Sequence, residues 1–158
     1  MNKTSPVRRT DSASRVIAAS PHAIYAAFVD GRAWERWLPP VGMTGCIDTF
    51  EARPGGRYKM ALTYSGEHVN RGKTSDDTDV VEGRFVEFTL DVRVVHAVSF
   101  DSSDPAFEGE MRMTWSLLPA VGGTEVSIIC ENVPEGISKD DHDKGLRSTL
   151  ENLAKFVE

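Results

Sequence analysis

The chain has 158 residues, of which 27% are charged and 40% are hydrophobic, and its formal net charge is −6. This length is typical of one domain with a sizeable core, and the acidic balance without a basic stripe argues against a general nucleic-acid-binding protein. No apolar run approaches the roughly 18 residues that cross a bilayer, and no apolar segment follows Arg8 and Arg9 as in an export signal, so we expect a cytoplasmic protein that is not bound to a membrane.

The sequence predicts an N-terminal tail followed by one folded domain. Residues 1–10 are polar and show no periodicity, so we expect a disordered tail there. Residues 11–158 contain no long linker and are predicted to form a single domain. Its first element is a strand over residues 11–19.

Two short helices are predicted after this strand. Ser20-Pro21 is typical of a helix start, because serine caps the free N–H groups and proline fits the first helical position. This helix is expected to end near Phe28. A second helix is predicted over residues 32–37, and Pro39-Pro40 ends it.

The middle of the chain is predicted to be nearly all strand. Apolar and polar side chains alternate, which is typical of a strand with one buried face. A hairpin is expected around Glu87-Phe88-Thr89, and the polar segment 65–78 is predicted to be a loop. The strands are predicted over residues 43–50, 57–64, 79–86, 91–100, 108–118 and a last strand around 126–130.

A long amphipathic helix is predicted from Ser138 to Glu158. Ser138 is a good N-cap, and Asp140 and Asp141 suit the positive end of the helix dipole. One apolar stripe recurs at helical spacing: His142, Leu146, Leu150, Leu153 and Val157. A strand meander with one apolar face needs a cover, and this helix is long enough to supply it. We therefore expect an α+β fold: a curved antiparallel sheet of about seven strands wrapped around the C-terminal helix.

The two cysteines, Cys46 and Cys130, are far apart in predicted strands and are expected to be buried free thiols, with a disulfide between them as the alternative. Neither has a further cysteine or a histidine at metal-ligand spacing. We therefore predict no zinc site, no other metal and no cofactor.

Several motifs resemble the START-like or SRPBCC superfamily, which shares the helix-grip fold of the birch pollen allergen. These motifs are Ser20-Pro21-x-x-Ile24-Tyr25-x-Ala27-Phe28, Trp34-x-x-Trp37-x-Pro39 and Arg53-Pro54-Gly55-Gly56-x-Tyr58. Later motifs resemble the branch named after the activator of heat-shock protein 90 ATPase. They are Phe100-Asp101-Ser102-x-Asp104-Pro105-x-Phe107, Met113-Thr114-Trp115, Gly122-Gly123-Thr124, Glu131-Asn132-Val133-Pro134-x-Gly136-Ile137 and Asp141-His142-x-x-Gly145.

The resemblance covers roughly residues 11–158 and implies a hollow between sheet and helix that often holds an apolar or aromatic ligand. Many relatives have tryptophan after the helix glycine, where this chain has Leu146. Members of the superfamily include lipid carriers, polyketide cyclases and a co-chaperone module. The family name alone therefore does not fix an activity.

His96 and His142 are the strongest candidates for a ligand-binding or acid–base role, because each is the polar residue on an otherwise apolar face. If both face the hollow, they can hydrogen-bond a ligand or act as acid and base near pH 7. The alternative is that His96 is a satisfied core residue and that His142 lies exposed in the first helical turn.

The other candidates are apolar or aromatic residues that suit an adaptable pocket wall. Simple core packing is the alternative for each of them, and Trp37 in particular is expected to pack the short helices onto the sheet. The complete predicted ligand-binding set is Trp37, Met60, Tyr64, His96, Met113, Trp115, His142, Leu146 and Leu150.

Three functions remain open. The first is a binding protein that holds a small apolar or aromatic ligand without turnover, and the absence of an assembled catalytic triad favours it. The second is an enzyme of cyclase, dehydratase or hydrolase type that uses His96, His142 or Tyr64 as acid or base. The third, ranked last, is a co-chaperone-like interaction module. A homodimer is plausible, because symmetric dimers are the commonest oligomers.

Overall fold

The computed structural model describes residues 8–39, 42–64, 78–100 and 102–158. The elements follow one another in the predicted order. They are β1 (Arg9–Ile17), α1 (Pro21–Phe28), α2 (Gly31–Trp37), β2 (Met43–Phe50), β3 (Arg57–Tyr64), β4 (Thr78–Thr89), β5 (Arg93–Phe100), the 3-10 helix η1 (Pro105–Phe107), β6 (Met111–Ala120), β7 (Gly123–Val133) and α3 (Lys139–Val157).

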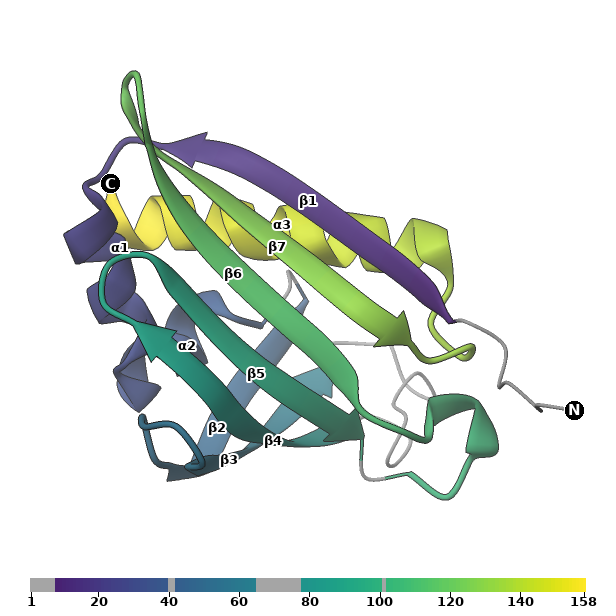
Figure 1. The fold of residues 1–158 in the computed structure, drawn as a ribbon. Coiled ribbons are helices and arrows are strands. Elements are labelled where there is room, and N and C mark those ends of the chain that lie inside the picture. The colour runs from purple at the N-terminus through teal and green to yellow at the C-terminus, as the bar shows by residue number, and fades with distance from the viewer. Residues whose placement is uncertain (1–7, 40–41, 65–77, 101) are drawn as a thin grey trace, which may run out of the picture.

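The strands form one antiparallel sheet in the order β1-β7-β6-β5-β4-β3-β2. Strands β2 to β7 are a meander in which each strand pairs with the next, and β1 joins the far side of β7. Figure 1 shows this sheet curving around α3, with α1 and α2 near the C-terminal end of that helix. The predicted α+β helix-grip fold is therefore confirmed.

Three side chains fix the starts of the helices, and the sequence predicts two of them, Ser20 and Ser138. The hydroxyl of Ser20 accepts the backbone N–H of Ala23 at the start of α1, and the hydroxyl of Ser138 accepts that of Asp141 at the start of α3. Asp30 accepts a backbone N–H in the first turn of α2. These caps satisfy N–H groups that have no partner within the helix.

The predicted β4–β5 turn was wrong. Strand β4 continues through Thr89, and the turn lies around Asp91, whose φ of 60° is left-handed. Aspartate tolerates this region better than most residues. The register of β4 with β5 shifts between Phe85 and Glu87, and Val92 is 44% exposed in the turn.

Other boundaries differ by a few residues. Strand β1 runs from Arg9 to Ile17, whereas the pattern predicts residues 11–19. Most of the predicted tail, residues 1–7, lies outside the described residues, as does the predicted loop except for Thr78, which begins β4. No helix in the described part of the chain is long and apolar enough to cross a membrane.

An aromatic cluster fills the end of the hollow beneath α1 and α2. The ring of Phe28 lies 5.0 Å from that of Trp37 and 5.1 Å from that of Trp115. The indole N–H groups of Trp34 and Trp37 donate to the carbonyl oxygens of Phe28 and Ala27, at 2.8 and 3.0 Å. Side chains thus close this end of the hollow, and open space remains under the first half of α3.

Candidate functional site

A cavity of about 900 Å³ lies between the inner face of the sheet and the N-terminal half of α3. Every strand from β2 to β7 contributes to its floor, and residues of α3 form its roof. Four methionines are in the lining: Met43, Met60, Met111 and Met113. Methionine side chains adapt their shape easily, so this wall can fit ligands of irregular outline.

Seven of the nine predicted ligand-binding residues line this cavity. They are Met60, Tyr64, His96, Met113, Trp115, His142 and Leu146. Trp37 and Leu150 do not. Trp37 is fully buried in the aromatic cluster, and Leu150, which is 1% exposed, packs in the hydrophobic core. Leu150 lies on the predicted apolar stripe of the helix, but both residues are in the part of the hollow that the protein itself fills.

Gly145 lies on the roof of the cavity. A Cβ atom added there would meet no described atom within 4 Å other than its own helix and chain neighbours. Glycine inside a helix is less favourable than alanine by about 1 kcal/mol. The helix therefore keeps a destabilising residue beside space that a side chain could occupy.

His96 lies fully buried on the floor between two aromatic partners. The indole Nε1–H of Trp115 donates to Nε2 of His96 at 2.9 Å, and Nδ1 of His96 lies 2.7 Å from the hydroxyl of Tyr58. Burial lowers the pKa of His96 to about 3. The imidazole is therefore neutral at pH 7 with both nitrogens engaged, which matches the predicted alternative of a satisfied core histidine.

The position of the Tyr58 ring in the cavity depends on a neighbouring glycine. Its ring lies directly on Gly83 of β4, where an added Cβ would overlap the phenol. The rings of Trp34 and Phe85 lie 5.1 and 5.2 Å away. Burial raises the pKa of the Tyr58 hydroxyl, so it stays protonated.

His142 lines the cavity from the first turns of α3 and is held by a buried carboxylate. Its Nδ1 lies 2.6 Å from Oδ2 of Asp11, whose side chain has no exposed surface. Arg9 donates to the same carboxylate at 2.8 and 3.0 Å, and the ammonium of Lys139 lies 3.8 Å from it. Burial raises the pKa of Asp11, but the hydrogen bonds and charges of Arg9 and His142 outweigh burial and place it below its ordinary value.

Sequence analysis missed Tyr58, Asp11 and Asp79 as site residues. Tyr58 shares the alternating face of Met60 and Tyr64, so the strand pattern contained its signal. Asp79 is 2% exposed in the cavity lining, and the hydroxyl of Tyr64 donates to it at 3.4 Å. Asp11 is distant from His142 in the sequence, and no local pattern links them.

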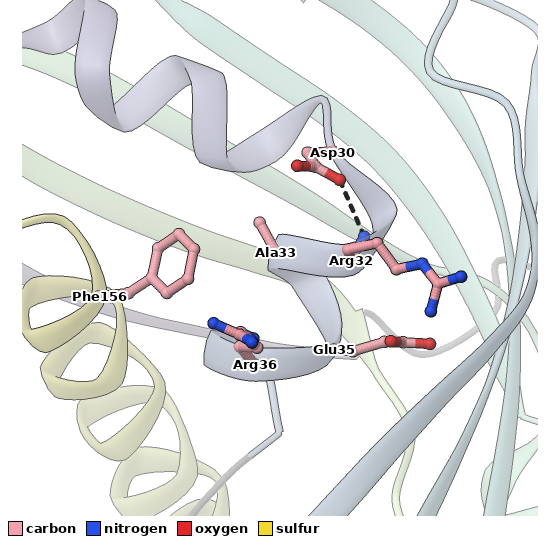
Figure 2. A pocket seen from close by; sticks show the side chains of 6 residues that line it. All are labelled: Asp30, Arg32, Ala33, Glu35, Arg36 and Phe156. Carbon is pink, nitrogen blue, oxygen red and sulfur yellow. Dashed lines mark hydrogen bonds between the residues drawn. The ribbon is translucent and has the colours of Figure 1, made fainter.

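A second depression, of about 370 Å³, lies on the surface between α2 and the end of α3 (Figure 2). Two of its polar side chains, Asp30 and Glu35, serve the fold. Asp30 accepts the backbone N–H of Arg32, and Glu35 accepts that of Ile47 in β2. Within the described residues, no group of three or more His, Cys, Asp or Glu side chains is placed to hold a metal ion. The large cavity is therefore the candidate functional site.

Comparison with known proteins agrees with the fold. The family described as activator of Hsp90 ATPase homolog 1-like protein matches residues 18–158. The crystal structure of a Chromobacterium violaceum protein is similar, with 31% identity, coverage of 94% of this chain and 96% of that one, and a TM-score of 0.83. A Rhodobacter sphaeroides protein has 22% identity, coverage of 92% and 90%, and a TM-score of 0.74.

An Aeromonas hydrophila protein, named as AHSA1-like, has 15% identity, coverage of 94% and 92%, and a TM-score of 0.70. At this identity the likeness concerns the fold alone. Comparison with curated protein sequences gives no match.

Proposed function

Because the chain belongs to the family of activator of Hsp90 ATPase homolog 1-like proteins, a fold family compatible with ligand binding, we propose that it binds a small apolar or aromatic molecule in the cavity under α3. Binding takes place without chemical change of the ligand. The observation that carries this proposal is the cavity itself, which has the size and the largely apolar lining of small-molecule sites.

The cavity wall supports binding of a ligand in two ways. Its methionines allow the pocket to adapt, and Gly145 leaves the roof open although a larger residue would stabilise the helix. A protein selected for stability alone gains by filling such space, because unfilled volume weakens a core. Retained space therefore favours occupation by a ligand.

Saturable binding of the fluorescent naphthalene ketone Prodan tests this proposal. We expect one molecule of probe per chain, with a blue shift that reports transfer to an apolar site. The Gly145→Leu variant fills the roof and should abolish the blue shift. Arg147→Leu is the matched control, because it adds leucine to the exposed face of the same helix. Equal binding by both variants would contradict the proposal.

An acid–base enzyme in the same cavity is the second candidate, and the Asp11–His142 pair favours it. The carboxylate holds the Nδ1–H of His142, which leaves Nε2 without a hydrogen-bond partner in the described part of the chain. A carboxylate-oriented imidazole is a common general base. A hydrolase of this kind should cleave p-nitrophenyl butyrate faster as the wild type than as His142→Gln, and equal rates would exclude this hydrolysis.

A co-chaperone-like interaction, suggested by the family name alone, stays a prediction with no specific contact in its favour. Co-purification of a heat-shock ATPase with the purified chain is its direct test. Failure of the ATPase to co-purify would contradict the predicted co-chaperone-like interaction.

A further inference from the structure

We propose that the ligand of the cavity carries a neutral hydrogen-bond acceptor, such as a ketone or ester carbonyl, and that the hydroxyl of Tyr58 donates to it. This inference rests on the proposed binding function and narrows its ligand class. The observation behind it is the buried chain of hydrogen bonds from Trp115 through His96 to Tyr58.

The direction of this chain is fixed by which groups can donate. The indole Nε1–H of Trp115 is a donor only, so Nε2 of His96 must supply the lone pair at 2.9 Å. A neutral imidazole then carries its hydrogen on Nδ1, which donates to the hydroxyl oxygen of Tyr58 at 2.7 Å. The hydroxyl of Tyr58 consequently accepts from His96 and still has its own hydrogen to donate.

No acceptor for this hydrogen is present among the described residues. The one side-chain hydrogen bond of the Tyr58 hydroxyl is the bond to His96, in which Tyr58 accepts. Tyr58 is 3% exposed and lines the cavity, so an acceptor for its hydrogen must come from whatever fills that space. Leaving a buried donor without an acceptor is unfavourable. Because Tyr58, His96 and Trp115 all line the cavity, a ligand there is the natural source of the acceptor.

The donor is also held rigidly. Gly83 leaves room for the phenol against β4, and the ring of Trp34 packs against both Tyr58 and His96, at 5.1 and 5.4 Å. A donor fixed before binding loses little freedom when the ligand arrives. The chain from Trp115 to Tyr58 has no formal charge, and a buried anion requires a paired charge. The match for this donor is therefore a neutral acceptor atom, such as a carbonyl oxygen.

A pair of probes with nearly the same shape tests the inference. 2-Acetylnaphthalene has a carbonyl oxygen where 2-isopropylnaphthalene has a methyl group, and equilibrium dialysis measures the binding of both. We expect Tyr58→Phe to weaken binding of the ketone roughly fivefold to tenfold, the size of one neutral hydrogen bond. Binding of the hydrocarbon should stay within about twofold. Equal weakening of both probes would overturn the inference and leave the binding function in place.

Trp115→Phe gives an independent test with Tyr58 intact. Without the indole donor, His96 can shift its hydrogen to Nε2, and the hydroxyl of Tyr58 can then donate to Nδ1. We expect this variant to lose preference for the ketone over the hydrocarbon. If the preference persists at the wild-type value, the proposed direction of the chain is wrong.

The tautomer of His96 is measurable without any ligand. It therefore tests the direction of the hydrogen-bond chain even if Tyr58→Phe fails to fold. Nitrogen-15 NMR of the wild-type imidazole should show a hydrogen on Nδ1 and none on Nε2. A hydrogen on Nε2 would overturn the inference. Binding of neither probe to the wild type would instead count against the proposed function.

Discussion

Asp11, near the start of β1, accepts a hydrogen bond from Nδ1 of His142 on α3 at 2.6 Å, across 131 positions of sequence. This bond joins β1 to α3 at the edge of the cavity that His142 lines, which we call the rim. Arg9 strengthens the join, because its guanidinium donates to the Asp11 carboxylate and to the carbonyl oxygen of Ile137. The rim therefore depends on one buried carboxylate.

Asp11→Asn should lower the free energy of unfolding at pH 7 by about 2 kcal/mol, because hydrogen bonds to a charged group are lost. The carboxylate of Asp11 has a pKa below its ordinary value, so its stabilisation is complete above about pH 4. It disappears as the pH falls through the pKa in the folded state. Urea unfolding of both proteins at pH 7 and pH 3 should show a larger difference between them at pH 7 than at pH 3.

Asp48→Asn is the control for this measurement, because Asp48 is exposed on β2. We expect it to change the free energy of unfolding by less than about 0.5 kcal/mol. A similar loss in both variants would mean that the contacts of Asp11 do not carry the effect.

His96 should make stability depend on pH in the acid range. Its pKa of about 3 in the folded state lies below the 6.5 of an unperturbed histidine, so the unfolded chain takes up a proton first. Stability from this residue is complete above pH 6.5 and falls below it, by up to about 1.4 kcal/mol for each pH unit. Urea unfolding between pH 7 and pH 5 measures the slope.

His96→Gln should flatten this slope whatever its effect on stability at pH 7. His22→Gln changes an exposed histidine on α1 and should retain the slope. If the wild type and His96→Gln have the same slope, the buried imidazole is not responsible for the acid loss.

Two substitutions of glycine by alanine should have opposite effects. At Gly83 the new methyl group overlaps the phenol of Tyr58, which must move, so we expect a loss of about 1–3 kcal/mol. At Gly145 the methyl group meets open space and the helix gains about 0.5–1 kcal/mol. Thermal and urea unfolding of both variants measure these changes, and effects of the same sign would contradict the cavity described beside α3.

The two thiols should differ sharply in reactivity. Cys46 was predicted to be buried but is exposed on β2, because its neighbours Gly45 and Ile47 turn inward in that strand. Cys130 is fully buried, and burial together with the charge of Asp11 raises its pKa to about 12. Ellman's reagent should label one thiol in the native protein and the second after denaturation. Cys46→Ser should abolish the rapid reaction.

The sequence predicts the elements of this fold well because alternation and capping are local signals. It places the β4–β5 turn too early, at Glu87-Phe88-Thr89, because the register shift between Phe85 and Glu87 interrupts the alternation there and no glycine or proline marks the true turn at Asp91. The site is harder to predict, since its geometry depends on contacts between distant elements. Trp37 and Leu150 show this, because an apolar stripe does not reveal which part of the hollow the core already fills.

The pairing of β1 with β7 has a consequence for the order in which the chain assembles. Each strand from β2 to β7 meets its next neighbour directly, whereas Arg9 of β1 pairs with Val133, near the other end of the chain. Local pairings close sooner than distant ones. During synthesis on the ribosome, β1 therefore cannot pair until β7 has emerged, and the rim of the cavity forms late. Pulse-labelled hydrogen exchange during refolding should show protection of the β2–β7 meander before β1.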